Sequence, residues 1–179
     1  MKTVSIYGKK FKLYMSDAEI ESTVQRLAHT ISADFTGMNP ILCPVLTGSY
    51  MFAADLSRQL TIDHEVSFVK FSSYQGMKST GSVKPILDYP RSCQGRSVII
   101  VEDIVDTGLT MDFMLRRLKE LEPASISICS FFFKPTSFKY NFNIDYIGRS
   151  IPDDFVVGYG LDYDEFGRHL PDIYILDEQ

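Results

Sequence analysis

The stretch Val-Ile-Ile-Val-Glu-Asp-Ile-Val-Asp-Thr-Gly-Leu-Thr, residues 98–110, decides the fold class of this 179-residue chain. It begins with four β-branched apolar residues, Val98 to Val101, as expected for a strand buried inside a parallel sheet. Two carboxylates, Glu102 and Asp103, come next. A loop of small polar residues follows, and then apolar residues at helical spacing that stop before Pro123. The order strand, acidic pair, loop and helix indicates an α/β protein.

The loop at residues 106–110 is expected to bind phosphate. Because it ends at a helix N-terminus, its backbone N–H groups and the helix dipole favour an anion. Gly108 would let the backbone approach that anion closely. Glu102 and Asp103 beside it would then bind Mg²⁺, or the hydroxyls of a sugar that carries the phosphate. The alternative interpretation is that these acids are only solvated loop residues and helix caps.

Composition is that of a single globular domain, with 45% apolar and 23% charged residues. The net charge of −5, with Lys and Arg scattered, does not indicate nucleic-acid binding. No apolar run is long enough for a membrane span, and the N-terminus does not read as a signal peptide. Cys43, Cys93 and Cys129 lack metal-ligand spacing and are expected to be buried free thiols, so we expect a cytoplasmic protein.

Apolar periodicity predicts strands that alternate with helices along the chain. Helices are expected from a capping box at Ser16 and Glu19 through Ile31, at about 50–60, and at 111–121. Strands or strand-like segments are expected at residues 4–13, 41–46, 66–71, 98–101, 125–133, 145–147, 155–157 and 173–176. Residues 72–96 show little periodicity and are expected to form a long loop.

The alternation of strands and helices from 41 to 133 predicts a parallel sheet with helices on both faces. Ligands of such sheets lie beyond the carboxyl ends of the strands. The loops at 47–49, 72–74, 102–110 and 134–137 all follow strands, so we expect them to converge on one edge of the sheet.

The string at 98–110 resembles the phosphoribosyl-diphosphate-binding motif of the type I phosphoribosyltransferases. From about residue 41 to 176 the chain is similar to the hypoxanthine-guanine group of that family. Three further strings carry the resemblance: Val-Leu-Thr-Gly-Ser-Tyr at 45–50, Ser73-Tyr74, and Phe-Val-Val-Gly-Tyr-Gly-Leu-Asp-Tyr-Asp-Glu-Phe-Gly-Arg at 155–168. The resemblance implies the type I phosphoribosyltransferase fold in one domain, residues 1–179. Its core would span about 35–148, a small hood about 1–15 and 150–179, and a mobile lid about 72–96.

The resemblance also implies roles for particular residues. The 5-phosphoribosyl group would be bound by Glu102, Asp103, Asp106, Thr107, Gly108, Leu109 and Thr110. Pyrophosphate would be bound by Leu46, Thr47, Gly48 and Arg168, with Thr47 where family members often have Lys. The purine would be bound by Lys134, Phe155, Val156 and Asp162, with the lid beginning at Ser73 and Tyr74. Mg²⁺ would be bound by Glu102, Asp103 and Asp162, and Asp106 would act on the proton at N7 of the base.

The activity implied is Mg²⁺-dependent transfer of the phosphoribosyl group to N9 of hypoxanthine or guanine in purine salvage, by a homodimer or homotetramer. The ammonium of Lys134 can donate to a 6-oxo group but not to a 6-amino group, which favours 6-oxopurines over adenine. Two alternatives remain. One is a regulator of the same fold that senses phosphoribosyl diphosphate and binds nucleic acid, which the acidic balance and Ser73-Tyr74 disfavour. The other is a transferase that prefers xanthine.

Overall fold

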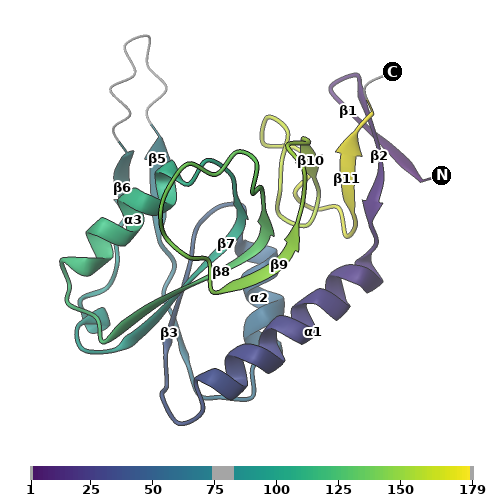
Figure 1. The fold of residues 1–179 in the computed structure, drawn as a ribbon. Helices are drawn as coiled ribbons and strands as arrows, with labels where there is room; N and C mark the ends of the chain where they lie inside the picture. Colours follow the sequence, from purple (N-terminus) through teal and green to yellow (C-terminus); the bar gives the residue numbers. More distant parts are fainter. Residues whose placement is uncertain (1, 74–82, 178–179) are drawn as a thin grey trace.

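The computed structural model describes residues 2–73 and 83–177 of the chain. Its centre is a five-stranded sheet in the order β4-β3-β7-β8-β9, in which every neighbouring pair is parallel (Figure 1). The strands are β3 (Ile41–Pro44), β4 (Glu65–Val66), β7 (Ser97–Val105), β8 (Ser125–Phe133) and β9 (Tyr146–Ser150). The predicted parallel sheet is therefore confirmed.

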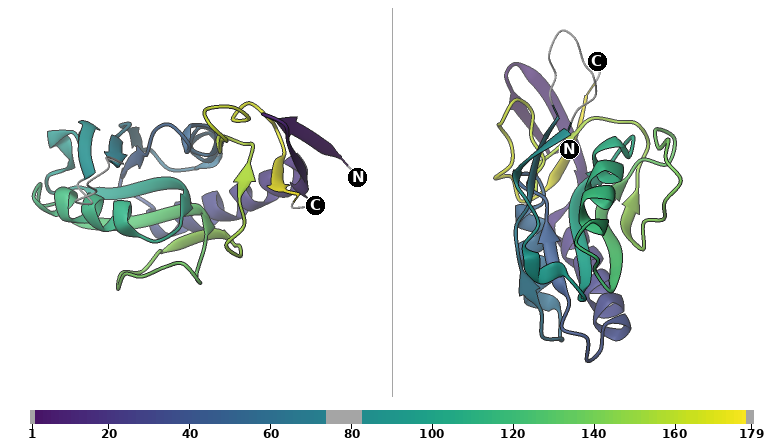
Figure 2. Two further views of the ribbon diagram at one scale, coloured as in Figure 1. Left: turned by 90° about the horizontal axis from the view of Figure 1, so that it is seen from above. Right: turned by 90° about the vertical axis from the view of Figure 1, so that its left-hand side faces the viewer.

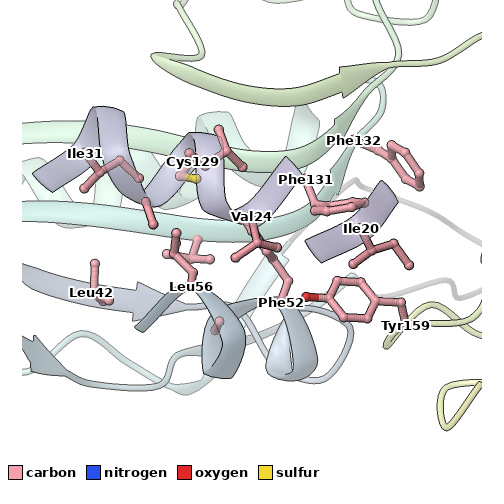
Figure 3. Close-up of a cluster of buried hydrophobic side chains, with 14 of the residues drawn as sticks. Ile20, Val24, Ile31, Leu42, Phe52, Leu56, Cys129, Phe131, Phe132 and Tyr159 are labelled. Carbon is pink, nitrogen blue, oxygen red and sulfur yellow. The ribbon is translucent and has the colours of Figure 1, made fainter. Parts of the chain in front are cut away.

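Helices cover both faces of this sheet, as predicted. They are α1 (Asp17–Asp34), which starts at the predicted capping box, α2 (Tyr50–Gln59) and α3 (Leu109–Lys119). Alternate residues of β7 point to opposite faces. Ile99 and Val101 pack in the cluster with α1 and α2, whereas Val98 and Ile100 pack in the cluster with α3. Figure 3 shows the first cluster, where side chains from both helices meet those of β8.

The strand order creates a topological switch point between β3 and β7. From β3 the chain passes through α2 to β4 on one side, whereas from β7 it passes through α3 to β8 on the other. Because α2 and α3 lie on opposite faces, the connections that leave β3 and β7 diverge. At such a switch point α/β proteins bind their ligands, in a crevice beyond the carboxyl ends of the two strands.

The two ends of the chain form a second, antiparallel sheet, which is the predicted hood. Its order is β1-β2-β11-β10, with β1 (Thr3–Ile6), β2 (Lys9–Met15), β10 (Val156–Val157) and β11 (Ile173–Leu176). The sheet stands at one end of the molecule (Figures 1 and 2). Phe11, Val157 and Tyr174 are buried in a small core of its own.

Asp172 joins the hood to α1 and is only 5% exposed. Its carboxylate accepts hydrogen bonds from the backbone N–H of Asp17 at 2.9 Å, from the Tyr174 hydroxyl at 3.1 Å and from the Lys2 ammonium. The bond from Lys2 is the largest of the causes that hold the pKa of Asp172 below its ordinary value. The buried carboxylate therefore favours its charged form.

The strand predicted at 66–71 was wrong, because that segment is divided between two sheets. Its beginning belongs to β4, and its end belongs to β5 (Lys70–Ser73), which pairs antiparallel with β6 (Val83–Leu87). After Val66 the segment stays hydrogen-bonded to β3 and the residues that follow it as far as Val69, and only then does it leave to pair with β6. The segment contains no Gly or Pro that would mark this change of partner.

Other boundaries also differ from the predictions. The region 72–96 was expected to be an irregular loop, but it contains β6 and a 3₁₀ helix at Arg91–Cys93. The segment 4–13 is a hairpin that turns at Tyr7 and Gly8, both with positive φ, rather than one strand. The strand at 41–46 ends at Pro44, and the strand at 145–147 runs instead from Tyr146 to Ser150. None of the described helices is both long and apolar enough to cross a bilayer.

Candidate functional site at the switch point

The acidic pair lies inside β7 and not in the loop after it, which corrects the predicted strand end at Val101. β8 stays paired with β7 as far as Val105, whereas β3 pairs with it only as far as Val101. The last residues of β7 therefore have a ladder partner on one side only. Glu102 and Asp103 lie in this half-paired segment, beside the crevice between β3 and β7.

The loop after β7 encloses a cavity of about 140 Å³. The cavity is lined by Glu102, Ile104, Val105, Asp106, Thr107, Gly108, Leu109, Thr110, Met111 and Met114. Gly108 occupies the N-cap position of α3 with a φ of +88°. Because glycine offers no side chain to the first turn, backbone N–H groups there can donate to an anion. The structure thus brings the predicted phosphate-loop residues around one cavity.

The loop after β3 meets the acidic pair at the crevice. A methyl group on Gly48 would lie 1.8 Å from Oδ2 of Asp103, so the Gly48 backbone lies directly against that carboxylate. A methyl group on Gly160, in the loop after β10, would lie 2.1 Å from the backbone oxygen of Gly48. Leu46 and Thr47 complete the turn, joined by a cis peptide bond, and Thr47 is exposed. The predicted convergence therefore holds for the loops after β3 and β7, and the hood adds a third loop.

The two carboxylates hold protons unusually tightly. Burial raises the pKa of Glu102 well above its usual range, and the neighbouring Asp103 raises it further. Burial also raises the pKa of Asp103 to about 6, opposed by backbone N–H groups and by Arg168. Oε2 of Glu102 is buried without a hydrogen-bond partner among the described residues. Buried carboxylate oxygens that lack a donor suit a hard divalent cation or sugar hydroxyls.

Arg168 and Asp162 lie together in the hood loop. Nη1 of Arg168 donates to the carbonyl oxygen of Gly160 and lies 2.9 Å from Oδ1 of Asp162, and Nη2 lies 3.0 Å from Oε2 of Glu165. Nε of Arg168 is buried and has no partner within the part of the chain that the structure describes. One N–H of a held guanidinium is thus left for an anion.

Lys134 follows β8 and is brought next to the predicted phosphate loop. Its backbone N–H donates to the carbonyl oxygen of Val105 at 3.0 Å, so the loop after β8 continues along the end of β7. The residue is only 8% exposed, and its ammonium lies 3.4 Å from Oδ1 of Asp153. Hydrogen bonds from Ser137 and then from Lys134 lower the pKa of Asp153.

Phe155, which is predicted to stack on the base, lies directly before β10 in the hood. Its side chain is 45% exposed, a large exposure for a Phe, whereas Val156 in β10 is buried. The ring contacts Tyr163 edge to face, with centroids 5.7 Å apart. Lys134 thus follows a strand of the parallel sheet, whereas Phe155 packs on hood residues and keeps part of its aromatic surface open to solvent.

Residues 16–164 of the chain match the phosphoribosyl transferase domain family. The chain belongs to the phosphoribosyltransferase family. The hypoxanthine phosphoribosyltransferase of Buchnera aphidicola is 43% identical over 163 residues, which cover 89% of this chain and 92% of that protein. The hypoxanthine-guanine phosphoribosyltransferase of Aquifex aeolicus is 39% identical over 175 residues, which cover 97% and 98%.

Solved phosphoribosyltransferase structures share this fold. The crystal structure of a hypoxanthine-guanine phosphoribosyltransferase from Bacillus anthracis, with HEPES in its active site, has a TM-score of 0.88 and 36% identity. The match covers 93% of this chain and 98% of that one. A hypoxanthine phosphoribosyltransferase from Staphylococcus aureus also has a TM-score of 0.88, at 34% identity over 93% of this chain and 91% of that one. The predicted type I phosphoribosyltransferase fold is confirmed.

In this phosphoribosyltransferase the predicted lid pair is not tested by the described structure, and the predicted metal-binding residues are not brought together. Ser73 ends β5, and Tyr74 lies outside the described residues, so the predicted lid pair stays a prediction. Within residues 2–73 and 83–177, no group of three or more acidic, His or Cys side chains could hold a metal ion. Glu102 and Asp103 are neighbours, whereas Asp162 pairs with Arg168.

Three residues around the phosphoribosyltransferase site were missed by the sequence reasoning. Asp153 pairs with Lys134, Gly160 accepts from Arg168, and Tyr163 packs on Phe155. The acidic doublet at 153–154 directly before an aromatic residue was an available signal for Asp153. Gly160 and Tyr163 stood within the string at 155–168, but only the fold shows what they contact.

Proposed function

We propose that this phosphoribosyltransferase transfers the 5-phosphoribosyl group of phosphoribosyl diphosphate to N9 of hypoxanthine or guanine in purine salvage. The products are IMP or GMP and pyrophosphate. The observation that carries the proposal is the backbone hydrogen bond from Lys134 to Val105, because it brings a largely buried lysine to the strand end that precedes the predicted phosphate loop. The relatives named hypoxanthine and hypoxanthine-guanine phosphoribosyltransferases, at 43% and 39% identity, support the same substrates.

In this proposal the loop after β7 binds the phosphoribosyl group. The segment Asp106–Thr110 surrounds the 5′-phosphate with backbone N–H groups from the first turn of α3. Glu102 and Asp103 hold the ribose hydroxyls, and the unpaired oxygen of Glu102 accepts a hydrogen bond from one of them. Both carboxylates would then ionise more readily, because donors favour the charged form.

The pyrophosphate end would lie at the loop after β3 and the hood loop. Backbone groups of Leu46, Thr47 and Gly48 contact it, and Nε of Arg168 donates to it. Glu102 and Asp103 offer neighbouring carboxylate oxygens of the kind that Mg²⁺ prefers, and in this proposal they and Asp162 would hold the ion when phosphoribosyl diphosphate is bound. Mg²⁺ supplies neutralisation of the negative charge that develops on the leaving pyrophosphate.

The purine would lie between Lys134 and Phe155. The Lys134 ammonium donates to the 6-oxo group, Phe155 stacks on the ring, and backbone groups near Val156 contact the other edge. Asp106 is exposed beside the loop and accepts the proton at N7 as N9 attacks the ribose carbon. Catalysis then rests on positioning the base against an electron-poor ribosyl centre and on stabilising the leaving group.

We further propose a homodimer or homotetramer in the cytoplasm, by analogy with the family and because the three cysteines are free and buried. Sedimentation velocity of the purified protein tests the assembly, and a single species at the monomer mass of 20.4 kDa would contradict it.

The test of the function is nucleotide formation from phosphoribosyl diphosphate, Mg²⁺ and each of hypoxanthine, guanine, xanthine and adenine. Turnover is expected with hypoxanthine or guanine and not with adenine. In Lys134→Ala, kcat/KM for hypoxanthine should fall about 10- to 100-fold, because a carbonyl loses a charged donor. Lys119→Ala, at the exposed end of α3, is the matched control and should behave as wild type. Turnover with xanthine alone would replace the substrate assignment, and RNA or DNA binding without any turnover would reject the enzyme.

A further inference from the structure

The Phe155 ring is held by other aromatic rings and not by a closely packed core. It is 45% exposed, and its ring contacts are with Tyr163 at 5.7 Å and Phe11 at 6.5 Å between centroids. Phe11 and Tyr163 also contact each other, at 6.1 Å, so the three residues form an aromatic triad. Because a base stacks only on a ring in the right plane, whatever fixes the plane of Phe155 affects how the base is bound.

Tyr163 is well placed to fix that plane. Its ring lies at 86° to Phe155, which is the preferred edge-to-face arrangement. The backbone of Tyr163 is itself held in a tight turn, where it exchanges two hydrogen bonds of 2.9 and 3.0 Å with Phe166. The two residues between them both have positive φ, as in a type I′ turn. On the ring, the ammonium of Lys9 lies 4.8 Å from the centroid.

Tyr163, which packs on the proposed base-stacking residue, is also next in sequence to a residue that pairs with the proposed pyrophosphate ligand Arg168. It directly follows Asp162, whose carboxylate pairs with Arg168 at 2.9 Å. The other member of the triad, Phe11, is fully buried in the hood core, so its ring is held in place by that core. A short run of the chain therefore carries both the residues assigned to the leaving group and the ring that supports Phe155.

We propose that Tyr163 is a positioning residue for the purine, which holds Phe155 in the plane where the base stacks. This inference rests on the proposed function, in which Phe155 is the stacking residue. Tyr163 acts through Phe155 and does not itself contact the reacting atoms. Loss of its ring should weaken base binding and leave the binding of phosphoribosyl diphosphate nearly unchanged.

The test is a kinetic comparison of Tyr163→Leu and Tyr163→Phe with wild type, with each substrate varied at saturating levels of the other. Tyr163→Leu should raise the KM for hypoxanthine about 2- to 10-fold, the equivalent of one aromatic pair, with the KM for phosphoribosyl diphosphate changed less than about 2-fold. Tyr163→Phe keeps the ring and should restore the wild-type KM. Lys9→Met, which removes only the cation above the ring, should raise the KM for hypoxanthine about 2-fold.

Tyr14→Leu is the matched control, because Tyr14 pairs edge to face with Phe132 outside the triad. It should leave both KM values unchanged. An unchanged KM for hypoxanthine in Tyr163→Leu would overturn the inference while leaving the proposed function intact. Parallel increases in both KM values would show a loosened hood loop and would also overturn it. If Tyr163→Leu does not fold, Lys9→Met decides the outcome. Wild-type protein without transfer to hypoxanthine would reject the proposed function and the inference together.

Discussion

Replacing Asp103 with Asn should stabilise the ligand-free protein and at the same time remove its activity. The pKa of Asp103 is raised from its ordinary value of 3.8 to about 6, mainly by burial. An acid with a raised pKa takes up protons in the folded state between these two pH values, so stability falls as the pH rises through them. Above pH 6 the full loss of stability caused by ionised Asp103 is present, and below pH 3.8 this loss vanishes.

The size of the effect follows from the same two values. One pH unit is worth about 1.4 kcal/mol, so ionised Asp103 lowers the free energy of unfolding by about 3 kcal/mol near pH 7.5. Asn has nearly the same shape and cannot ionise, so most of this penalty should disappear. Removal of the charge should also lower the pKa of the neighbouring Glu102, which Asp103 helps to raise.

Urea unfolding of wild type and Asp103→Asn, at pH 7.5 and at progressively lower pH without Mg²⁺, measures the difference. The variant should be more stable by about 2 to 3 kcal/mol at pH 7.5, and the gain should shrink as the pH falls towards 4. Asp106→Asn, at the exposed position in the adjoining loop, should change stability by less than about 0.5 kcal/mol. Equal stability at pH 7.5, or a gain that does not depend on pH, would refute the reasoning that burial of this carboxylate destabilises the fold.

Three further predictions concern the proton, the close contact of loops and the hood. Asp106→Asn should lower kcat more than about 10-fold with the KM for phosphoribosyl diphosphate within about 3-fold, and an unchanged kcat would remove it from proton transfer. Gly160→Ala should unfold more easily than Gly37→Ala and bind pyrophosphate more weakly. Both glycines have positive φ but only Gly160 faces a backbone atom, so equal losses would mean that the contact with Gly48 is unimportant. Asp172→Asn should lower the free energy of unfolding by about 1 to 3 kcal/mol at pH 7. The pKa of Asp172 is lowered in the folded state, so its ionised carboxylate stabilises the fold at pH values above the ordinary pKa of 3.8. In urea titrations the difference in stability between this variant and wild type should shrink as the pH falls below that value. A difference that does not change with pH would mean that the ionised form of Asp172 is not what stabilises the fold.

Much of the core could be predicted because its signals are local. A β-branched run such as Val98–Val101, a capping box at Ser16 and apolar residues at helical spacing each depend on near neighbours along the chain. The parallel sheet and its flanking helices followed from their alternation. The segment 66–71 failed for the opposite reason, since its change of partner from β3 to β6 depends on elements elsewhere in the chain.

The electrostatics of the site belong to the tertiary structure. The sequence placed Glu102 and Asp103 beside a predicted phosphate loop, but their raised pKa values arise from burial at a half-paired strand end. Lys134 looked like an ordinary strand-end residue until the bond to Val105 set it beside the loop after β7. The aromatic support of Phe155 by Tyr163 and Phe11 joins residues far apart in the chain.

By itself, the sequence determined that residues 98–110 hold a buried strand, a loop of small polar residues and the start of a helix, because those preferences are set by side-chain shape and spacing over a few residues. Only the tertiary structure decided that Gly48, Gly160 and Arg168 reach the same crevice and that Phe155 stays open to solvent. Such contacts depend on strand order and on pairing between the two ends of the chain, which are collective properties of the packed fold and not of any one segment.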